Sequence, residues 1–351
     1  MSNRLRKITE IVRAVLTGVP SHERRYQRRV ASIGPVQPPE FDLVFVLPPP
    51  HHQGWILDGI CREIDTHCDG RTASVSLGER LPPARAYFYA HYGYMRGVLL
   101  QQPEILHGRN LVFFTHPRRL WYSDDELMYV MNMADSVVCM CSRFVPELIE
   151  KGLSPERVEV ALVGADADRF QPHIRGTGKI GFCSGYVPRK GGHRILEIVR
   201  SMPNNSFVLC GKKWPDWNRF DELTSLTNFE YIDIPYSEYQ DFYNSIDVFV
   251  SVSELEGGPV PLIEAAMCNA VPVCSNTGHA PDIIVHGKNG FLFDPAAPIS
   301  EIVTLIREAF DCPCDVRSTV EHLTWKRFSH QIQEIAGLRH AETDGSISEA
   351  A

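Results

Sequence analysis

The chain of 351 residues lacks several features that would place it in a specialised class of protein. No apolar run approaches the roughly eighteen residues of a membrane-spanning helix, and the amino terminus has neither the apolar core nor the cleavage site of a signal peptide. The ten cysteines include no C-x-x-C pair, so neither a disulfide framework nor a zinc site is supported. We therefore expect buried, reduced thiols in a cytoplasmic protein.

The chain has no excess of positive charge, because 35 basic residues stand against 43 acidic ones and the formal net charge is −8, which argues against nucleic acid as the main partner. The charge is uneven along the chain. Residues 1–33 carry eight basic side chains against two acidic ones, and apolar residues recur at helical spacing between residues 5 and 16. Two interpretations stay open: a patch for anionic lipid headgroups, which would make the protein peripheral to a membrane, or a helix packed on the first domain with its arginines in water.

Short apolar segments alternate with helical patterns from residue 41 onwards. Such alternation is typical of mainly parallel sheets with helices on both faces, here in two doubly wound domains joined by a polar linker at 166–178. The predicted strands are 42–47, 73–77, 86–91, 110–116, 136–142, 158–163, 180–184, 206–210, 229–232, 248–252 and 271–274. The predicted helices include 55–67, 124–133, 143–151, 193–200, 237–245 and 261–267.

The most informative segment is SVSELEGGPVPLIE at residues 251–264, in which seven residues separate Glu256 from Glu264. A buried strand precedes it, a glycine–proline loop fills it, and a helix begins at its end. Backbone N–H groups and the positive end of the helix dipole then meet at one point, which suits a phosphate or diphosphate. The two carboxylates would reach hydroxyl groups on either side. A diphosphate flanked by two polyols is a nucleotide sugar.

A second glycine-containing loop, GYVPRKGG at residues 185–192, also lies between a strand and a helix. It lacks the G-x-G-x-x-G spacing of dinucleotide-binding folds and the closing Gly-Lys-Ser/Thr of a Walker A loop. A lysine at this place can pair with the β-phosphate of a bound diphosphate and stabilise it as a leaving group.

These segments resemble motifs of the retaining glycosyltransferases of the family 4 type, which have the GT-B fold. EGGPVPLIEA at 256–265 is similar to the Glu-x7-Glu signature of that family, written E-G-F-G-L-P-x-x-E-A. The resemblance covers nearly the whole chain after residue 40, because further similar segments follow in the family's order. They lie at 134–142, 163–170, 182–191, 289–293 and 323–325.

The resemblance implies two Rossmann-like domains that face each other across a cleft. We expect a basic helical segment at 1–40, an acceptor-side domain at 41–170 and a nucleotide-sugar-binding domain at 171–323. A helix at 324–340 would cross back to the first domain, and 341–351 would be a disordered tail.

The resemblance also assigns roles to single residues. It puts Lys190 on the leaving diphosphate and His116 over the donor sugar, so that His116, Lys190 and Glu256 form the catalytic group. The family's arginine after the first loop glycine is Tyr186 here, so either Arg189 or Lys212 supplies the second positive charge, or one contact is absent. The expected donor-binding residues are Arg189, Lys212, Ile234 (through its backbone, at the base), Gly257, Gly258, Pro259, Val260 and Glu264.

The acceptor side is less well defined, because the loop after the first strand reads HHQGW where the family has a glycine-rich loop. The expected residues are His51, His52, Gln53, Gly54, Trp55 and Arg118. Asp166 and Asp168 form a D-x-D pattern, but it lies in the linker, and Lys190 with the helix dipole already offers charge compensation. We therefore expect no metal and no other cofactor.

The resulting hypothesis is a retaining transfer of a sugar from a nucleoside diphosphate sugar to a hydroxyl acceptor, in polysaccharide or glycolipid assembly. Two alternatives use the same scaffold: a nucleotide-sugar epimerase, and a non-catalytic GT-B protein that binds nucleotide or carbohydrate. The sequence does not separate the nucleotides, the sugars or the acceptors.

Overall fold

The computed structural model describes residues 20–52 and 56–339, whose contacts divide the chain into two units. The first unit holds the chain up to Cys139, Val145–Val160 and the residues from Ser329 onwards, and the second holds Met140–Phe144 and Ala161–Phe328. Each unit is built on one parallel sheet of six strands. The predicted α/β class with two doubly wound domains is confirmed.

The sheet of the first unit has the order β2-β1-β3-β4-β5-β6, and every strand pair in it is parallel. The order reverses between β1 and β3. Phe88 lies between Phe45 and Phe113, with ring centroids 6.1 and 5.5 Å away, so aromatic side chains of three adjacent strands pack together. The strands are β1 (Phe41–Leu47), β2 (Thr72–Ser76), β3 (Ala84–Tyr89), β4 (Arg109–Phe114), β5 (Ser136–Cys139) and β6 (Val158–Val160).

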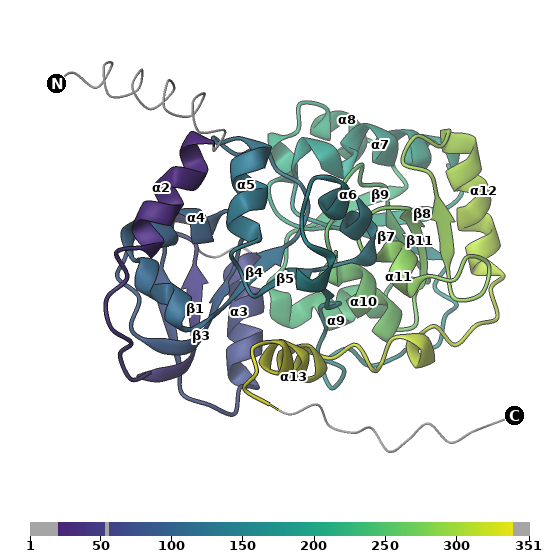
Figure 1. Ribbon diagram of the computed structural model, residues 1–351. Helices are drawn as coiled ribbons and strands as arrows, with labels where there is room; N and C mark the ends of the chain where they lie inside the picture. Colours follow the sequence, from purple (N-terminus) through teal and green to yellow (C-terminus); the bar gives the residue numbers. More distant parts are fainter. Residues whose placement is uncertain (1–19, 53–55, 340–351) are drawn as a thin grey trace, which may run out of the picture. The chain divides into compact units, whose positions relative to one another are not determined.

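Helix α2 (Ser21–Val30) contains the second part of the basic amino-terminal region. Its Tyr26 is completely buried and donates a hydrogen bond of 2.8 Å to Glu126, and the helix packs against α4 and α5 (Figure 1). The helix expected between residues 5 and 16 lies outside the described residues. The other helices of this unit are α3 (Ile56–Thr66), α4 (Tyr94–Gln101), α5 (Asp124–Met131) and α6 (Val145–Glu150).

The sheet of the second unit has the order β12-β11-β10-β7-β8-β9, again with parallel pairs. Strands such as β10 are buried along most of their length, as expected for a sheet with helices on both faces. Its strands are β7 (Lys179–Cys183), β8 (Ser206–Cys210), β9 (Phe229–Ile232), β10 (Val248–Ser251), β11 (Val271–Ser275) and β12 (Phe291–Phe293).

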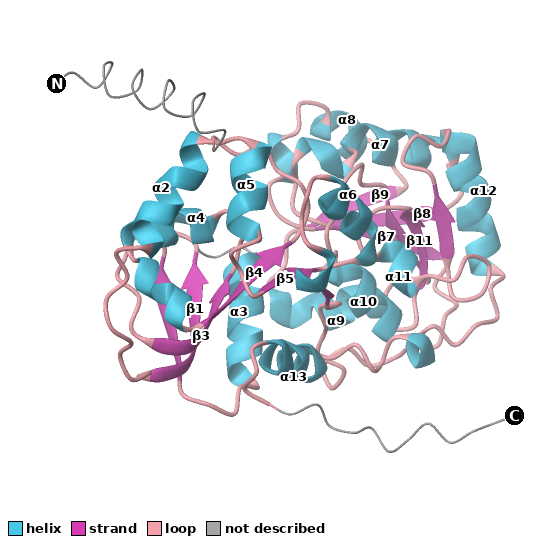
Figure 2. Ribbon diagram, viewed as in Figure 1, coloured by secondary structure: helices cyan, strands magenta, loops and turns pink. Residues whose placement is uncertain are grey.

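The helices of the second unit cover both faces of this sheet, with α7 and α8 on one face and α9 and α10 on the other (Figure 2). None of the helices in the described part of the chain has the length and apolarity that crossing a membrane requires. The helices are α7 (Gly192–Ser201), α8 (Phe220–Thr224), α9 (Tyr239–Asn244), α10 (Val260–Met267), α11 (Ala280–Ile283) and α12 (Ile299–Phe310). The last helix, α13 (Trp325–Ile335), begins in the second unit and continues into the first.

The structure differs from the sequence-based prediction in several segments. The strand expected at 136–142 ends at Cys139, because the chain then turns and the Ser142 N–H donates to Asp282 at 3.0 Å. The strand expected at 158–163 ends at Val160. The segment 289–293, where no strand was predicted, contains strand β12, which pairs with β11. The polar segment 166–178, expected to be a linker, packs within the second unit, where Phe170 is completely buried.

Candidate active site

Two loops of the second unit leave the sheet where the strand order reverses. Strands β7 and β10 are neighbours although they are distant in sequence, and β8 and β11 lie on their outer sides. The loop after β7 carries Arg189 and Lys190, and the loop after β10 carries Glu256. In open α/β sheets, ligands bind beyond the carboxyl ends of the strands at such a point.

The Glu256 carboxylate lies between two cations. Lys190 Nζ forms an ion pair with Oε1, and Arg189 Nη1 lies 3.2 Å from Oε2. The Arg189 guanidinium also donates to the carbonyl of Leu255. Two positive charges and one negative charge leave an excess of one positive charge at this place, which favours an anionic ligand.

The protonation state of Glu256 follows from these neighbours. Its burial disfavours the charged form, but the charges of Lys190 and Arg189 outweigh burial and lower the pKa of the carboxyl from 4.5 to about 2. Glu256 is therefore a carboxylate throughout the neutral pH range. It can accept hydrogen bonds from hydroxyl groups, but it has no proton to donate.

Backbone contacts keep the two loops together, and two glycines permit them. The Glu254 N–H donates to the Arg189 carbonyl at 2.8 Å. Gly191 has a φ of 72°, and a Cβ there would lie 2.8 Å from the Val252 carbonyl oxygen. Gly278 has a φ of 57°, and a Cβ there would lie 2.5 Å from the carbonyl oxygen of Gly257. Larger residues at either place would push the loops apart.

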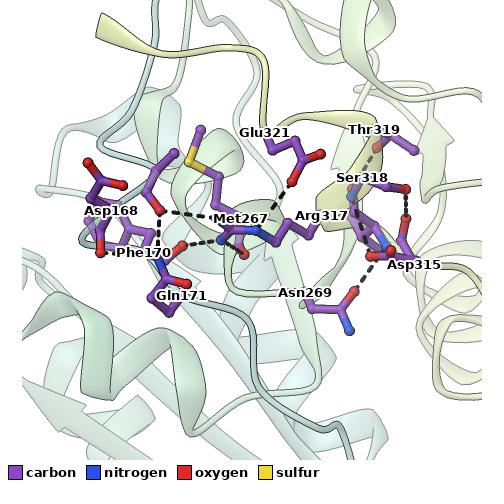
Figure 3. Close-up of polar contacts among 12 residues, drawn as sticks. Asp168, Phe170, Gln171, Met267, Asn269, Asp315, Arg317, Ser318, Thr319 and Glu321 are labelled. Carbon is purple, nitrogen blue, oxygen red and sulfur yellow. Dashed lines mark hydrogen bonds and ion pairs between the residues drawn. The ribbon is translucent and has the colours of Figure 1, made fainter.

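Helix α10 begins directly after this loop, with Pro259 before its first residue and Val260 at its start. Pro261 has no N–H and the Leu262 N–H donates to the Pro259 carbonyl at 2.9 Å, so it is mainly the positive end of the helix dipole that favours an anion there. The other end of α10 is also held, because the Arg317 guanidinium donates to the Met267 carbonyl at 2.9 Å and to the Phe170 carbonyl (Figure 3). A cation at the carboxyl end of a helix stabilises it.

Glu264 lies on the second turn of α10 and is only 2% exposed. Its two oxygens accept hydrogen bonds from Tyr236 at 2.6 Å and Tyr243 at 2.7 Å. Burial raises the pKa of Glu264 from 4.5 to about 6, although the two tyrosine hydroxyls lower it. Tyr236 is 44% exposed, so a ligand hydroxyl can take its place on the carboxylate without disturbing the core.

His279 was not identified from the sequence, although it lies beside the same loop. The side chain is completely buried, and its Nε2 lies 3.2 Å from the Pro259 carbonyl, which only an Nε2–H can bond. Burial lowers the pKa of His279 to about 4, so the ring is neutral. Its Nδ1 has no hydrogen-bond partner within the described residues, and a Cβ at Gly258 would lie 3.1 Å from it. The sequence signal that could have identified this histidine is the Thr-Gly-His turn at residues 277–279, which follows a buried strand.

The remaining predicted donor residues lie in separate loops of this unit. Lys212 is exposed, and its carbonyl accepts from the Tyr186 N–H at 2.8 Å, while Arg189 already lies on Glu256. Of the two residues proposed to replace the missing arginine, the structure thus brings Arg189 and not Lys212 to the cluster. Tyr186 packs on Trp214, with ring centroids 5.3 Å apart. Ile234 follows β9 and is half-buried.

Asp166 and Asp168 form a local turn, because the Asp166 carboxylate accepts from the backbone N–H groups of Asp168 and Arg169 at 3.1 and 3.0 Å. Over residues 20–52 and 56–339, no three His, Cys, Asp or Glu side chains are grouped so that they could hold a metal ion.

The predicted residues of the first unit lie beyond the carboxyl ends of its strands. His116 follows β4 and is 8% exposed, and Arg118 Nε donates to its Nε2 at 3.2 Å, so the ring proton is on Nδ1. His51 and His52 follow β1, with their rings 4.3 Å apart. The predicted Gln53, Gly54 and Trp55 lie outside the described residues.

Comparison with known proteins finds a family model that matches most of the second unit. Residues 165–322 match the sequence model of the family Glycosyl transferases group 1. A GDP-mannose-dependent α-(1-6)-phosphatidylinositol monomannoside mannosyltransferase of Mycolicibacterium smegmatis is 25% identical over 239 residues, which make up 58% of this chain and 62% of the relative. The match therefore spans less than two thirds of that relative.

Solved structures agree on the fold of most of the chain. HepE of Anabaena, in complex with UDP-glucose, has a TM-score of 0.68 at 14% identity, and the match covers 85% of this chain and 100% of that one. A glycosyltransferase of Rickettsia africae ESF-5 has a TM-score of 0.64 at 14% identity, covering 84% of this chain and 97% of that one. The chain has the GT-B fold, and its residues 165–322 match the group 1 glycosyltransferase model.

Proposed function

We propose that this GT-B chain with a group 1 glycosyltransferase domain transfers a sugar from a nucleoside diphosphate sugar to a hydroxyl acceptor. The observation that carries the proposal is the cluster of Lys190, Arg189 and Glu256 beside the start of α10. It combines excess positive charge, the positive end of a helix dipole and a carboxylate that stays ionised. These are the groups that a diphosphate and the hydroxyl groups of its sugar require.

Each group then has a role. Lys190 and the first turn of α10 stabilise the diphosphate as it leaves, because its negative charge grows when the glycosidic bond breaks. Glu256 accepts hydrogen bonds from the donor sugar. Glu264 accepts them from the ribose, where they replace the bond from Tyr236. The backbone near Ile234 reads the base, and His116 orients the sugar.

We propose a retaining reaction in which the acceptor attacks on the face that the diphosphate leaves. Glu256 is a poor nucleophile, because two cations hold its charge and its pKa is lowered to about 2. The departing phosphate, in contrast, can take the proton of the acceptor hydroxyl. Lys190 and the positive end of the α10 dipole neutralise the diphosphate in this scheme, so the reaction needs no metal ion.

For the acceptor, we propose a hydroxyl group of a polysaccharide or glycolipid that is assembled at a membrane surface. The relative from Mycolicibacterium smegmatis is named for a phosphatidylinositol mannoside acceptor. In the present chain, Arg24, Arg25, Arg28 and Arg29 of α2 line a hollow of about 320 Å³ while Tyr26 anchors the helix. Packing and an outward basic face are therefore compatible, and the four arginines favour an anionic headgroup layer.

The catalytic proposal is tested by a screen of GDP- and UDP-sugars, with calorimetry for binding and release of nucleoside diphosphate for turnover. Lys190→Ala should abolish turnover and weaken diphosphate binding by about 1.5–3 kcal/mol, as expected for a charged hydrogen bond. Lys288→Ala, which removes an exposed lysine of the same unit, is the matched control. Equal turnover in both variants would refute the assignment of Lys190.

The membrane proposal is tested by sedimentation with vesicles that contain phosphatidylserine. Arg28→Glu with Arg29→Glu should release the protein, and wild-type attachment should weaken with salt, since screening limits these charges to about 8–10 Å. The control pair Lys288→Glu with Lys326→Glu changes the net charge equally on the second unit. If the wild-type protein ignores anionic vesicles at low salt, α2 is only a packing element.

A further inference from the structure

A cavity of about 520 Å³ lies in the first unit, beyond the carboxyl ends of its strands. It is formed by the segment after β2, by α4, and by the loop between β4 and α5. Its volume is within the range of about 300–1,000 Å³ typical of small-molecule sites. None of the residues expected above for the acceptor side lines this cavity, although Tyr122 of its lining is four residues from Arg118.

One wall of the cavity is an aromatic surface held in place from behind. Trp121 is 78% exposed, yet the Arg96 guanidinium lies 4.1 Å from the centre of its ring. Arg96 is itself buried and donates to Glu126 at 2.8 Å, and Glu126 also accepts from Tyr26 of α2. Because one face of the indole is covered by Arg96, most of its exposed surface is the other face.

An isolated tryptophan on a protein surface is seldom held by a buried ion pair, as Trp121 is here. Immobilising a side chain normally costs free energy in a binding event. Here Arg96, held by Glu126, already contacts one face of the indole. The flat, apolar face of a pyranose ring matches such a platform in shape and polarity.

The polar groups of the cavity indicate an uncharged ligand. Its lining includes one acidic and one basic side chain, Glu79 and Arg80, so their formal charges cancel. His91 is 6% exposed, and burial, together with Arg118 and His116, lowers its pKa to about 3, so the ring is neutral. Gly93 N–H donates to His91 Nδ1 at 3.0 Å, which leaves Nε2–H as the ring's donor for a ligand.

We propose that this cavity binds the ring of a neutral sugar, stacked on Trp121 and hydrogen-bonded to His91, as the acceptor end of the proposed transfer. That the bound sugar is the acceptor rests on the proposed function, but the binding of the sugar to this cavity does not depend on the donor site. It commits to an uncharged pyranoside rather than to a phosphate-bearing headgroup, because the lining has no excess of positive charge.

The test uses methyl α-mannopyranoside, methyl α-glucopyranoside and maltose as probes, without any nucleotide. Protein labelled with 5-fluorotryptophan gives a signal for each of its five tryptophans, and Trp121→Phe identifies the one from Trp121. We expect at least one probe to shift that signal saturably. Trp121→Leu should weaken probe binding about tenfold, since losing a stacked aromatic face removes about 1.4 kcal/mol, whereas Trp121→Phe should retain most of it.

Further variants separate this proposal from its alternatives. His91→Phe keeps a flat ring but removes the donor, and should weaken probe binding about three- to tenfold. Lys190→Ala should leave glycoside binding unchanged, so loss of nucleotide binding and loss of glycoside binding are distinguishable failures. The proposal is overturned if no probe binds, if Trp121→Leu binds as well as the wild type, or if inorganic phosphate shifts the Trp121 signal and the glycosides do not.

Discussion

Replacing Glu264 with glutamine should stabilise the protein at neutral pH and weaken nucleotide binding at the same time. The carboxyl is 2% exposed, and burial raises its pKa from 4.5 to about 6 in the folded protein. Each pKa unit corresponds to about 1.4 kcal/mol, so the ionised carboxylate destabilises the folded state by about 2 kcal/mol. Glutamine is neutral at every pH and can still exchange hydrogen bonds with the hydroxyls of Tyr236 and Tyr243.

The sign of the pH dependence follows from proton linkage. Between pH 4.5 and 6 the folded state holds the Glu264 proton more tightly than the unfolded state does, so the folded state binds more protons. Stability then falls as pH rises through this window, and the full penalty is present above it. The Glu264→Gln variant should lack this fall, so the two proteins should differ most at pH 7.5 and least below pH 4.5.

The assay is denaturant unfolding followed by tryptophan fluorescence at pH 4.5, 6 and 7.5, compared with Glu238→Gln, which alters an exposed glutamate near Tyr236. In parallel, calorimetry with the nucleoside diphosphate should show binding weakened by about 1.5–3 kcal/mol, because an amide is a weaker acceptor than a carboxylate. A variant that is less stable than the wild type at pH 7.5, or that binds nucleotide equally well, would refute the reasoning.

Three further predictions follow from the same site. Lys190→Met should lower the free energy of unfolding at pH 7 by about 1–3 kcal/mol. This difference in stability between variant and wild type should shrink as pH falls toward the folded-state pKa of Glu256, about 2, because that carboxylate loses its charge in both proteins. Gly278→Ala should destabilise the protein and disrupt donor binding, since its Cβ would lie 2.5 Å from a backbone atom. The control Gly287→Ala is also at positive φ but has no atom within 4 Å, so it should cost only about 1 kcal/mol of stability. Equal effects of the two variants on donor binding would contradict this account. Turnover should survive excess chelator, and a loss that manganese or magnesium restores would show that a metal ion takes part in the reaction.

Local pattern predicted much of the fold. Buried parallel strands are continuous apolar runs, and they end at glycine, proline or polar residues, so β8 and β9 match the sequence-based bounds residue for residue. The loop that carries Glu256 was recognisable for the same reason, because Pro259 and Pro261 break one element and begin the next. Expectations failed where a distant partner decided the outcome, as at residues 140–144, where Asp282 bonds Ser142.

The sequence by itself determined which residue types stand at the two loops of the site, and hence the chemistry that they can perform. Only the tertiary structure decided what each of them contacts. Tyr236 and Tyr243 hold Glu264 from 28 and 21 residues away, and Arg189 rather than Lys212 joins Lys190 on Glu256. Such partners depend on strand order and on the packing of whole elements, which bring distant residues together without leaving a mark in the sequence around either one.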